Sequence, residues 1–129
     1  MASALITFYG KTDGSSTTGD FSLDSPILHS TVTYVRIPKG MKAKVWCKRI
    51  SGEVATDVII SYTDDVTVSS PTWKELSHER LASPGELILE KRRPVVILGR
   101  TGKEAFKVSW SQPSAGNAYV EIEVELTDE

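Results

Sequence analysis

The chain has 129 residues, which is enough for one domain of ordinary size and too few for two comfortable ones. Its 40% hydrophobic and 25% charged residues are typical of a globular domain and exclude a disordered or membrane-embedded chain. A formal charge of −2 gives no general attraction for nucleic acid, and the one cysteine, Cys47, excludes an internal disulfide.

The N-terminal residues do not have the features of a signal peptide. Met1–Gly10 lacks the basic start and the small-residue cleavage site of a signal peptide. The longest aliphatic run, residues 95–98, is far shorter than the roughly 20 residues that span a bilayer. We therefore expect a soluble protein without membrane insertion, either cytoplasmic or part of an assembled particle.

The first predicted strand is Leu5–Tyr9, and the flexible residues 14–19 separate it from the rest. Residues 1–19 are thus a candidate N-terminal arm, which either docks on its own domain, the favoured alternative, or reaches a neighbouring subunit. Strands are predicted next at Phe21–Leu23 and Thr31–Ile37. The apolar phase shifts within the latter, which indicates a bulge or a strand buried on both faces.

Met41–Arg49, after the turn Pro38-Lys39-Gly40, shows a clear alternation that predicts a half-buried strand. One face carries Met41, Ala43, Val45 and Cys47, and the other carries Lys42, Lys44, Trp46 and Lys48. Trp46 is therefore predicted on an outward, lysine-rich face, and the Cys47 thiol on the buried face.

The second half of the chain continues the same pattern. Strands are predicted at Asp57–Thr63, Glu86–Glu90, Pro94–Gly99 and Ala105–Trp110. Residues 71–81 fit either a short helix or an edge strand, and the strand is favoured. Trp73 and Trp110 are interpreted as core residues.

The last predicted strand is Asn117–Leu126, in which Tyr119 and three glutamates alternate with aliphatic residues. With it, the sequence predicts eight to ten short strands separated by turns. That pattern favours a single all-β domain over residues 1–129, an antiparallel β-sandwich for which a jelly roll is one fitting arrangement.

The outward faces of two predicted strands carry opposite charges. Lys42, Lys44 and Lys48 form one row, and Glu121, Glu123 and Glu125 form the other. The rows either pair within one sheet or meet between subunits, and the sequence leaves both alternatives open. Trp46 and Tyr119 stand among these charges and, with Lys42 and Lys44, are candidate binding residues.

Lys91, Arg92 and Arg93 form a basic cluster at a predicted turn. Three adjacent cations are able to bind phosphate, so weak contact with nucleic acid or with an acidic partner is one interpretation. A solvated turn in a net acidic chain is the favoured alternative.

Motifs for catalysis or metal binding are missing from the sequence. Residues 99–103 evoke a phosphate-binding loop, but the glycine spacing is wrong and a glutamate follows the lysine. Cys47 and the two histidines lie too far apart in sequence for a structural zinc site. His78 lies near Glu75 and Glu79, where a solvated edge is favoured over an acid–base group. We predict no catalytic residue, metal or cofactor.

Three functional hypotheses remain. The favoured one is a non-enzymatic structural subunit that assembles with itself or with another structural protein. In its pattern of strands the chain resembles the small jelly-roll modules of viral coat and decoration proteins, although it carries no signature motif of them. The alternatives are a carbohydrate-binding module that uses Trp46 and Tyr119, and a small hydrolase-type enzyme.

Overall fold

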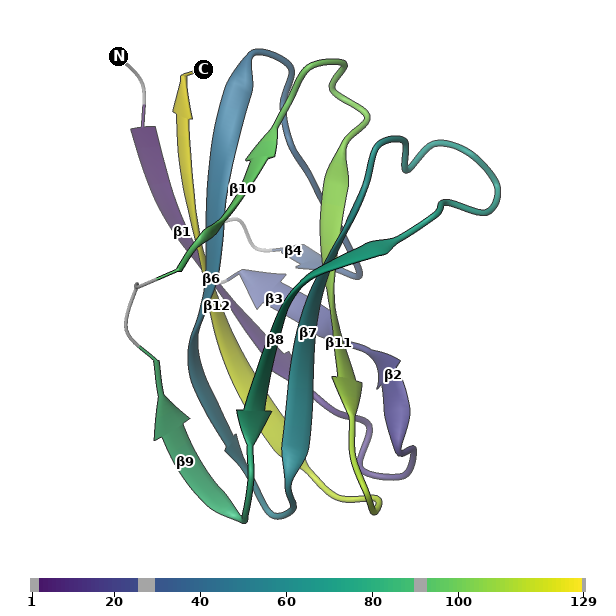
Figure 1. Ribbon diagram of the computed structural model, residues 1–129, viewed down its shortest axis with the longest axis vertical. Helices are drawn as coiled ribbons and strands as arrows, with labels where there is room; N and C mark the ends of the chain where they lie inside the picture. The colour runs from purple at the N-terminus through teal and green to yellow at the C-terminus, as the bar shows by residue number, and fades with distance from the viewer. Residues whose placement is uncertain (1–2, 26–29, 90–92, 129) are drawn as a thin grey trace.

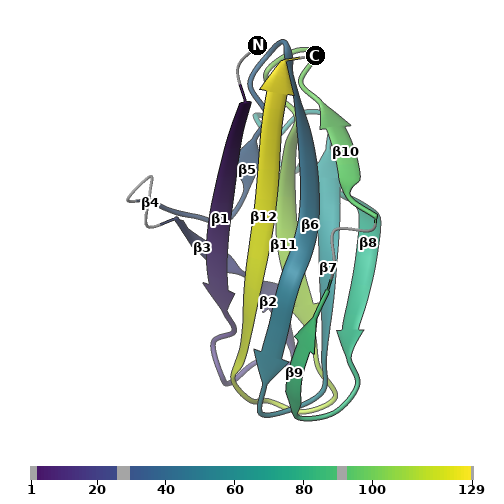
Figure 2. The same ribbon diagram turned by 90° about the vertical axis from the view of Figure 1, so that its left-hand side faces the viewer.

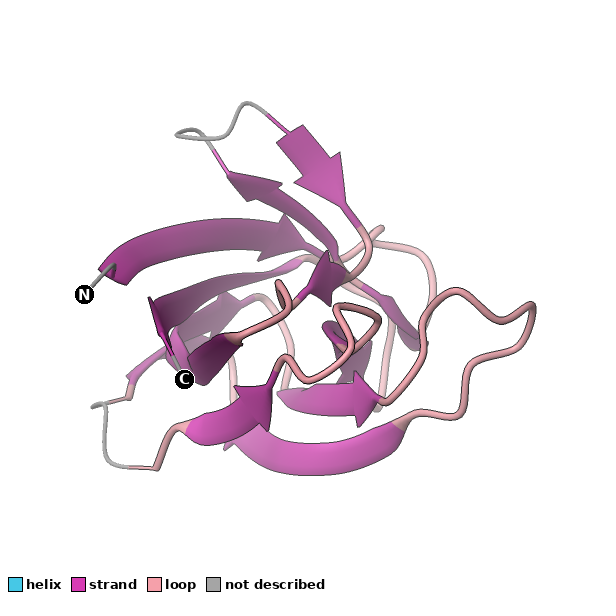
Figure 3. Cartoon of the chain, turned by 90° about the horizontal axis from the view of Figure 1, so that it is seen from above, coloured by secondary structure: helices cyan, strands magenta, loops and turns pink. Residues whose placement is uncertain are grey.

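The computed structural model describes residues 3–25, 30–89 and 93–128, which form two antiparallel sheets packed face to face (Figure 1). Seen from above, the strands lie in two layers (Figure 3). None of the described residues forms a helix long and apolar enough to cross a membrane. The predicted antiparallel β-sandwich is confirmed, with twelve strands in the described ranges instead of eight to ten.

The larger sheet, sheet A, is built around two long strands that pair with each other. Its order is β10-β6-β12-β1-β3-β4, and β9 pairs with the second half of β6. Its members are β1 (Ser3–Lys11), β3 (Ser22–Ser25), β4 (Ser30–Val32), β6 (Met41–Gly52), β9 (Gly85–Ile88), β10 (Val95–Leu98) and β12 (Ala118–Asp128).

The smaller sheet, sheet B, has the order β2-β11-β7-β8, and β5 also pairs with β11. Its members are β2 (Thr18–Asp20), β5 (Val35–Arg36), β7 (Thr56–Thr63), β8 (Lys74–Leu81) and β11 (Ala105–Ser111). Residues 71–81 therefore contain a strand at the edge of the sheet, and the favoured prediction for them is confirmed.

The core lies between the sheets, where the inward side chains of both alternations meet. Val45 and Ile122 of sheet A and Val108 of sheet B are fully buried in it. The rings of Phe21 and Trp110 meet edge to face with centroids 5.1 Å apart, so the core position of Trp110 is confirmed. The prediction for Trp73 is wrong, because this ring is only partly buried and lies beneath the Lys107 ammonium group.

Two segments differ from the sequence-based expectation. Thr31–Ile37 is not one strand: it contains β4 of sheet A and β5 of sheet B, so the phase shift marks the place where the chain crosses between sheets. The predicted flexible residues 14–19 include the start of β2. Gly19 lies against the Trp110 ring, and a Cβ there would come within 2.6 Å of it, so only glycine fits this approach.

β6 changes phase at a β-bulge. Arg49 pairs with Glu121, and Cys47 pairs with the next residue, Ile122, so Lys48 is an extra residue in β6. Because of the bulge, Cys47 and Ile50 both point into the core although they are three residues apart. Lys48 and Arg49 are consequently both exposed on the outer face of sheet A.

β1, the strand of the candidate N-terminal arm, lies within sheet A of its own chain. It pairs with β12 along its whole length, from Ser3 opposite Thr127 to Lys11 opposite Tyr119. On its other side, β3 pairs only with residues 9–11, near the lower end of β1 in Figure 2. Residues 3–8 thus have no strand partner on that side among the described residues.

Candidate functional site

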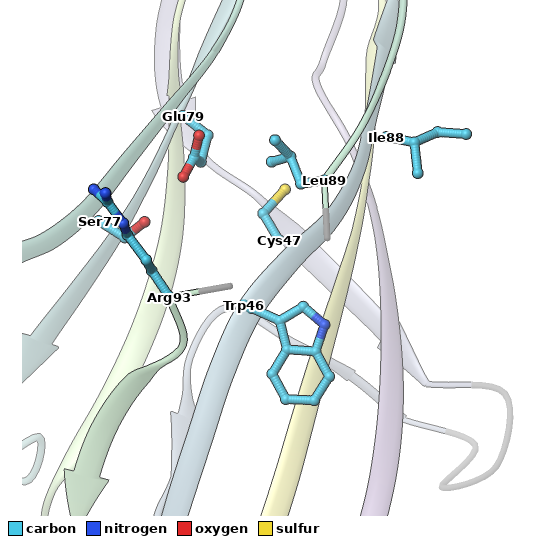
Figure 4. Close-up of a pocket in the computed structure, with 7 residues that line it drawn as sticks. All are labelled: Trp46, Cys47, Ser77, Glu79, Ile88, Leu89 and Arg93. Carbon is cyan, nitrogen blue, oxygen red and sulfur yellow. The ribbon is translucent and has the colours of Figure 1, made fainter. Parts of the chain in front are cut away.

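A break in the pairing of β6 creates the candidate site. β10 pairs with Lys42–Val45 and β9 with Arg49–Gly52, so no described strand pairs with this edge of β6 at Trp46 and Cys47. A pocket of about 410 Å³ lies between this edge and β8 of sheet B (Figure 4). Its described lining residues are Trp46, Cys47, Ser77, Glu79, Ile88, Leu89 and Arg93.

Trp46 lies on the predicted side of β6, but the prediction of an exposed ring is wrong. Trp46 lies opposite Glu123, whose carboxylate contacts the exposed Lys48, so Trp46 points to the outer face of sheet A as expected. The indole is nevertheless only 7% exposed. The physical reason is that the ring lines a pocket with Ile88 at the end of β9 and Arg93 ahead of β10, so residues distant in sequence surround an outward position.

The pocket offers polar groups for binding but no activated nucleophile. Burial raises the pKa of the Cys47 thiol to about 12, and the negative charges of Glu79 and Glu121 add to the effect. The thiol is therefore protonated at neutral pH and unreactive. The Glu79 carboxylate and the Arg93 guanidinium lie on one side of the pocket in Figure 4, so the site presents both signs of charge to a ligand.

The charged rows lie side by side in one sheet, because β6 and β12 are neighbours. Lys48 Nζ is 3.1 Å from a carboxylate oxygen of Glu123, and Arg49 Nη1 is 3.6 Å from Glu121. Lys44 lies opposite Glu125 in the register, and Lys42 lies opposite Thr127. Of the two alternatives that the sequence left open, the within-sheet pairing is the one the structure contains.

Tyr119 is 45% exposed on the outer face of sheet A, as predicted, and the aromatic residue that lines a depression with it is Tyr9 and not Trp46. Tyr9 and Tyr119 line a shallow depression of about 230 Å³ together with Arg49 and Glu121. The Lys11 ammonium group lies 5.8 Å from the centroid of the Tyr119 ring. The sequence did not indicate Tyr9, because only the pairing of β1 with β12 brings the two rings together.

The basic cluster is only partly described. Lys91 and Arg92 lie outside the described residues, and Arg93 lines the pocket beside Trp46. A binding role for these residues, and for Lys42, Lys44, Trp46 and Tyr119, stays a prediction.

The residues that favoured an acid–base group are separated by the strand alternation of β8. His78 contacts Glu75 through Nδ1 at 2.8 Å and Asp57 through Nε2 at 3.0 Å, on the outer face of sheet B. Glu79 lines the pocket on the other side of β8. Among the described residues, no group of three or more His, Cys, Asp or Glu is arranged to hold a metal ion.

The His78 contacts predict a measurable dependence of stability on pH. The bond to Asp57 raises the pKa of His78 above its usual value; burial opposes this effect and Glu75 reinforces it. The stability that the charged His78 contributes is fully present below its unfolded pKa of about 6.5, and it is lost as pH rises through the folded pKa. We expect His78→Gln to lower the free energy of unfolding by up to about 1 kcal/mol at pH 6. The loss should be smaller at pH 8.5 than at pH 6.

Urea unfolding of both proteins at the two pH values measures this difference. Subtracting the variant from the parent isolates His78 from the other histidine of the chain. A difference in unfolding free energy that is the same at both pH values would contradict a protonated, ion-paired His78.

The loop that evoked a phosphate site holds an anion of its own. Glu104 is buried, with 5% of the residue exposed. Its carboxylate accepts hydrogen bonds from the N–H groups of Arg100, Thr101 and Gly102 at 3.1 to 3.2 Å. The Thr101 hydroxyl donates another at 3.0 Å. The donors that a bound phosphate would need are therefore engaged by the glutamate that follows the lysine.

Comparison with known proteins identifies a fold but no family. No protein-family model matches the chain, and no curated protein matches it. A structure from Bacillus endospore appendages, described as a family of disulfide-linked pili, is similar with a TM-score of 0.51 at 8% identity, over 98% of this chain and 89% of that chain. It shares the fold of the present chain.

Other solved structures are more distant. TmCBM61, solved with β-1,4-galactotriose, gives a TM-score of 0.40 at 13% identity, covering 97% of this chain and 70% of its own. Broad bean stain virus gives a TM-score of 0.38 at 13% identity, covering 99% of this chain and 85% of its own.

Proposed function

We propose that this chain is a non-enzymatic structural subunit, of the coat or appendage type, that acts through contacts with other copies of itself or with another structural protein. The open edge of β1 carries the proposal. Residues 3–8 are paired with β12 on one side and have no described strand partner on the other. Such an edge presents unpaired N–H and C=O groups, which another strand is able to satisfy.

The chemistry of the other sites is consistent with this proposal. The pocket beside Trp46 contains a protonated thiol, and the His78 contacts lie on an open sheet face. Cys47 is only 5% exposed, so its thiol is not accessible for a disulfide with another subunit. Assembly would therefore be non-covalent.

The charged rows of sheet A predict how salt should act. Lys48 and Arg49 pair with glutamates of their own sheet, so these charges are engaged within the subunit. Contacts made by main-chain hydrogen bonds and apolar side chains are little screened by salt. We therefore expect self-association that depends on protein concentration and hardly on ionic strength.

Light scattering coupled to size-exclusion chromatography tests the proposal. A single strand edge makes a small interface, of less than about 1,200 Å² of buried surface, and such interfaces are weak. The protein concentration should therefore be varied up to roughly a few hundred micromolar. The expected result is a mass that rises with concentration equally at low and high salt. A monomer mass at every concentration would contradict assembly with copies of itself and leave only another structural protein as the partner.

A further inference from the structure

We propose that two copies pair through their open β1 edges, antiparallel about a two-fold axis, so that sheet A continues from one copy into the other. The inference rests on the proposed function and names the partner as a second copy of this chain. It predicts one interface on each subunit and a closed dimer as the first species formed.

The long edge of sheet B is protected against such pairing, and β1 is not. β8 has eight residues, of which five are charged or titratable, and its pairing with β7 is irregular near Leu76. Charges and irregularities of this kind are the usual protection of an edge strand. Residues 3–9 of β1 contain no charged residue and no proline, and their pairing with β12 is regular.

The remaining described edges of sheet A are short. β4 has three residues, and β9 and β10 have four each. A strand that added to one of them would gain few main-chain hydrogen bonds. The open stretch of β1 is therefore the longest unprotected edge in the described parts of the molecule.

A strand pairs with its own copy only if the side chains that face each other across the axis are compatible. Across a two-fold axis the residue on the axis lies opposite its own copy, and the residues next to it lie close to theirs, so a charge near the axis would lie close to its like. The sequence of residues 3–8, Ser-Ala-Leu-Ile-Thr-Phe, raises no such conflict. Pairing of β1 with β8 of a second copy would instead place its uncharged residues against a charged strand.

The alternation of β1 restricts the register of the pair. In one continuous antiparallel sheet, residues directly opposite each other point to the same face. A residue on the outer face, such as Leu5, must therefore face an odd-numbered residue of the partner, and Ile6 must face an even-numbered one. Of the registers that meet this condition, the two that pair the most of residues 3–8 place the two-fold axis between the two Leu5 residues or between the two Ile6 residues.

The side chains around this edge also favour a partner. Leu5 is 57% exposed on the outer face, and Ile6 is half-buried on the inner face. A groove of about 520 Å³, lined by Phe8, Val32 and Val35 among others, opens beside the inner face. In the proposed dimer the two Ile6 side chains lie close together where the grooves of the two copies meet.

Two lysine variants test the inference. Leu5→Lys places two like charges directly or diagonally opposite each other across the axis, roughly 5–8 Å apart. Val96→Lys is the matched control, because Val96 is 51% exposed on the same sheet but lies on β10, away from β1. We expect Leu5→Lys to raise the dimer dissociation constant at least about tenfold, and Val96→Lys to change it less than about twofold.

A charge-swap experiment then identifies the partner strand. An equimolar mixture of Leu5→Lys and Leu5→Glu should dimerise again, whereas each variant alone should not. If the parent chain associates and Leu5→Lys associates as well as Val96→Lys does, the two-fold pairing is wrong and the proposed function survives. If the parent chain never associates, assembly with copies of itself fails first.

Disulfide trapping covers the case in which a charged variant fails to fold. Leu5→Cys is a smaller, uncharged change, and buried Cys47 does not compete for oxidant. Ile6→Cys is made alongside it, because only the residue on the axis meets its own copy closely enough for a disulfide. Under oxidised glutathione we expect a covalent dimer from Leu5→Cys or from Ile6→Cys, according to which residue lies on the axis, and none from Val96→Cys. Trapping of Val96→Cys to the same extent as the β1 variants, or trapping of neither β1 variant, would overturn the inference.

Discussion

Replacing Glu104 with alanine is expected to lower the free energy of unfolding by about 2–4 kcal/mol. Only 5% of the residue is exposed, and its carboxylate accepts hydrogen bonds from three backbone N–H groups and the Thr101 hydroxyl. Removing it leaves those donors without their acceptor in a partly buried loop. Urea or thermal unfolding at pH 7 measures the loss.

An exposed glutamate provides the control. Glu86 pairs with Arg49 at 3.0 Å but both side chains are 44% exposed, so Glu86→Ala should cost less than about 0.5 kcal/mol. Equal losses for the two variants would show that the loop donors are satisfied equally well by water.

The Glu104 effect should also depend on pH. Burial acts to raise the pKa of Glu104, but backbone N–H donors, including its own and that of Thr101, outweigh burial and hold the pKa below its usual value. The contribution of Glu104 to stability is therefore present above its unfolded pKa of 4.5 and is lost as pH falls through the folded pKa. The difference between the parent and Glu104→Ala should shrink between about pH 5 and pH 3.

Much of the fold could be predicted from the sequence because alternation is a local property. The side chains of β6 and β12 alternate with a period of two, and that pattern alone separates Val45 from Lys44 and Ile122 from Glu123. Short strands that depend on distant partners were harder to predict. β2 lies in a stretch of glycine, serine and threonine, and it is a strand because β11 pairs with it.

The candidate site could be predicted only in part, for the same reason. The outward direction of Trp46 follows from its neighbours in sequence, but its burial depends on residues that the fold brings to the same pocket, such as Ile88 and Arg93. Tyr9 and Tyr119 are 110 positions apart in sequence, and only the β1–β12 register brings them together. The anion held by residues 100–102 is Glu104, the residue whose presence argued against a phosphate loop.

Replacing Gly99 with alanine is expected to destabilise the chain by about 3 kcal/mol or more. A Cβ at this position would lie 2.1 Å from the carbonyl oxygen of Pro38. The backbone is not free to move away, because the Gly99 N–H donates to Met41 and the Gly99 carbonyl accepts from Gly40, both at 2.7 Å. Denaturant unfolding of purified protein measures the effect.

Gly40, in the adjoining turn, separates this steric conflict from the ordinary backbone preference of glycine. Its φ is 85°, and a Cβ at this position would meet no atom of the described residues within 4 Å. Gly40→Ala should therefore cost only about 1 kcal/mol, the strain of a left-handed backbone. If the two variants lost equal stability, the Pro38 carbonyl would not be the cause, and the tight closure between β5, β6 and β10 would have to be relaxed in solution.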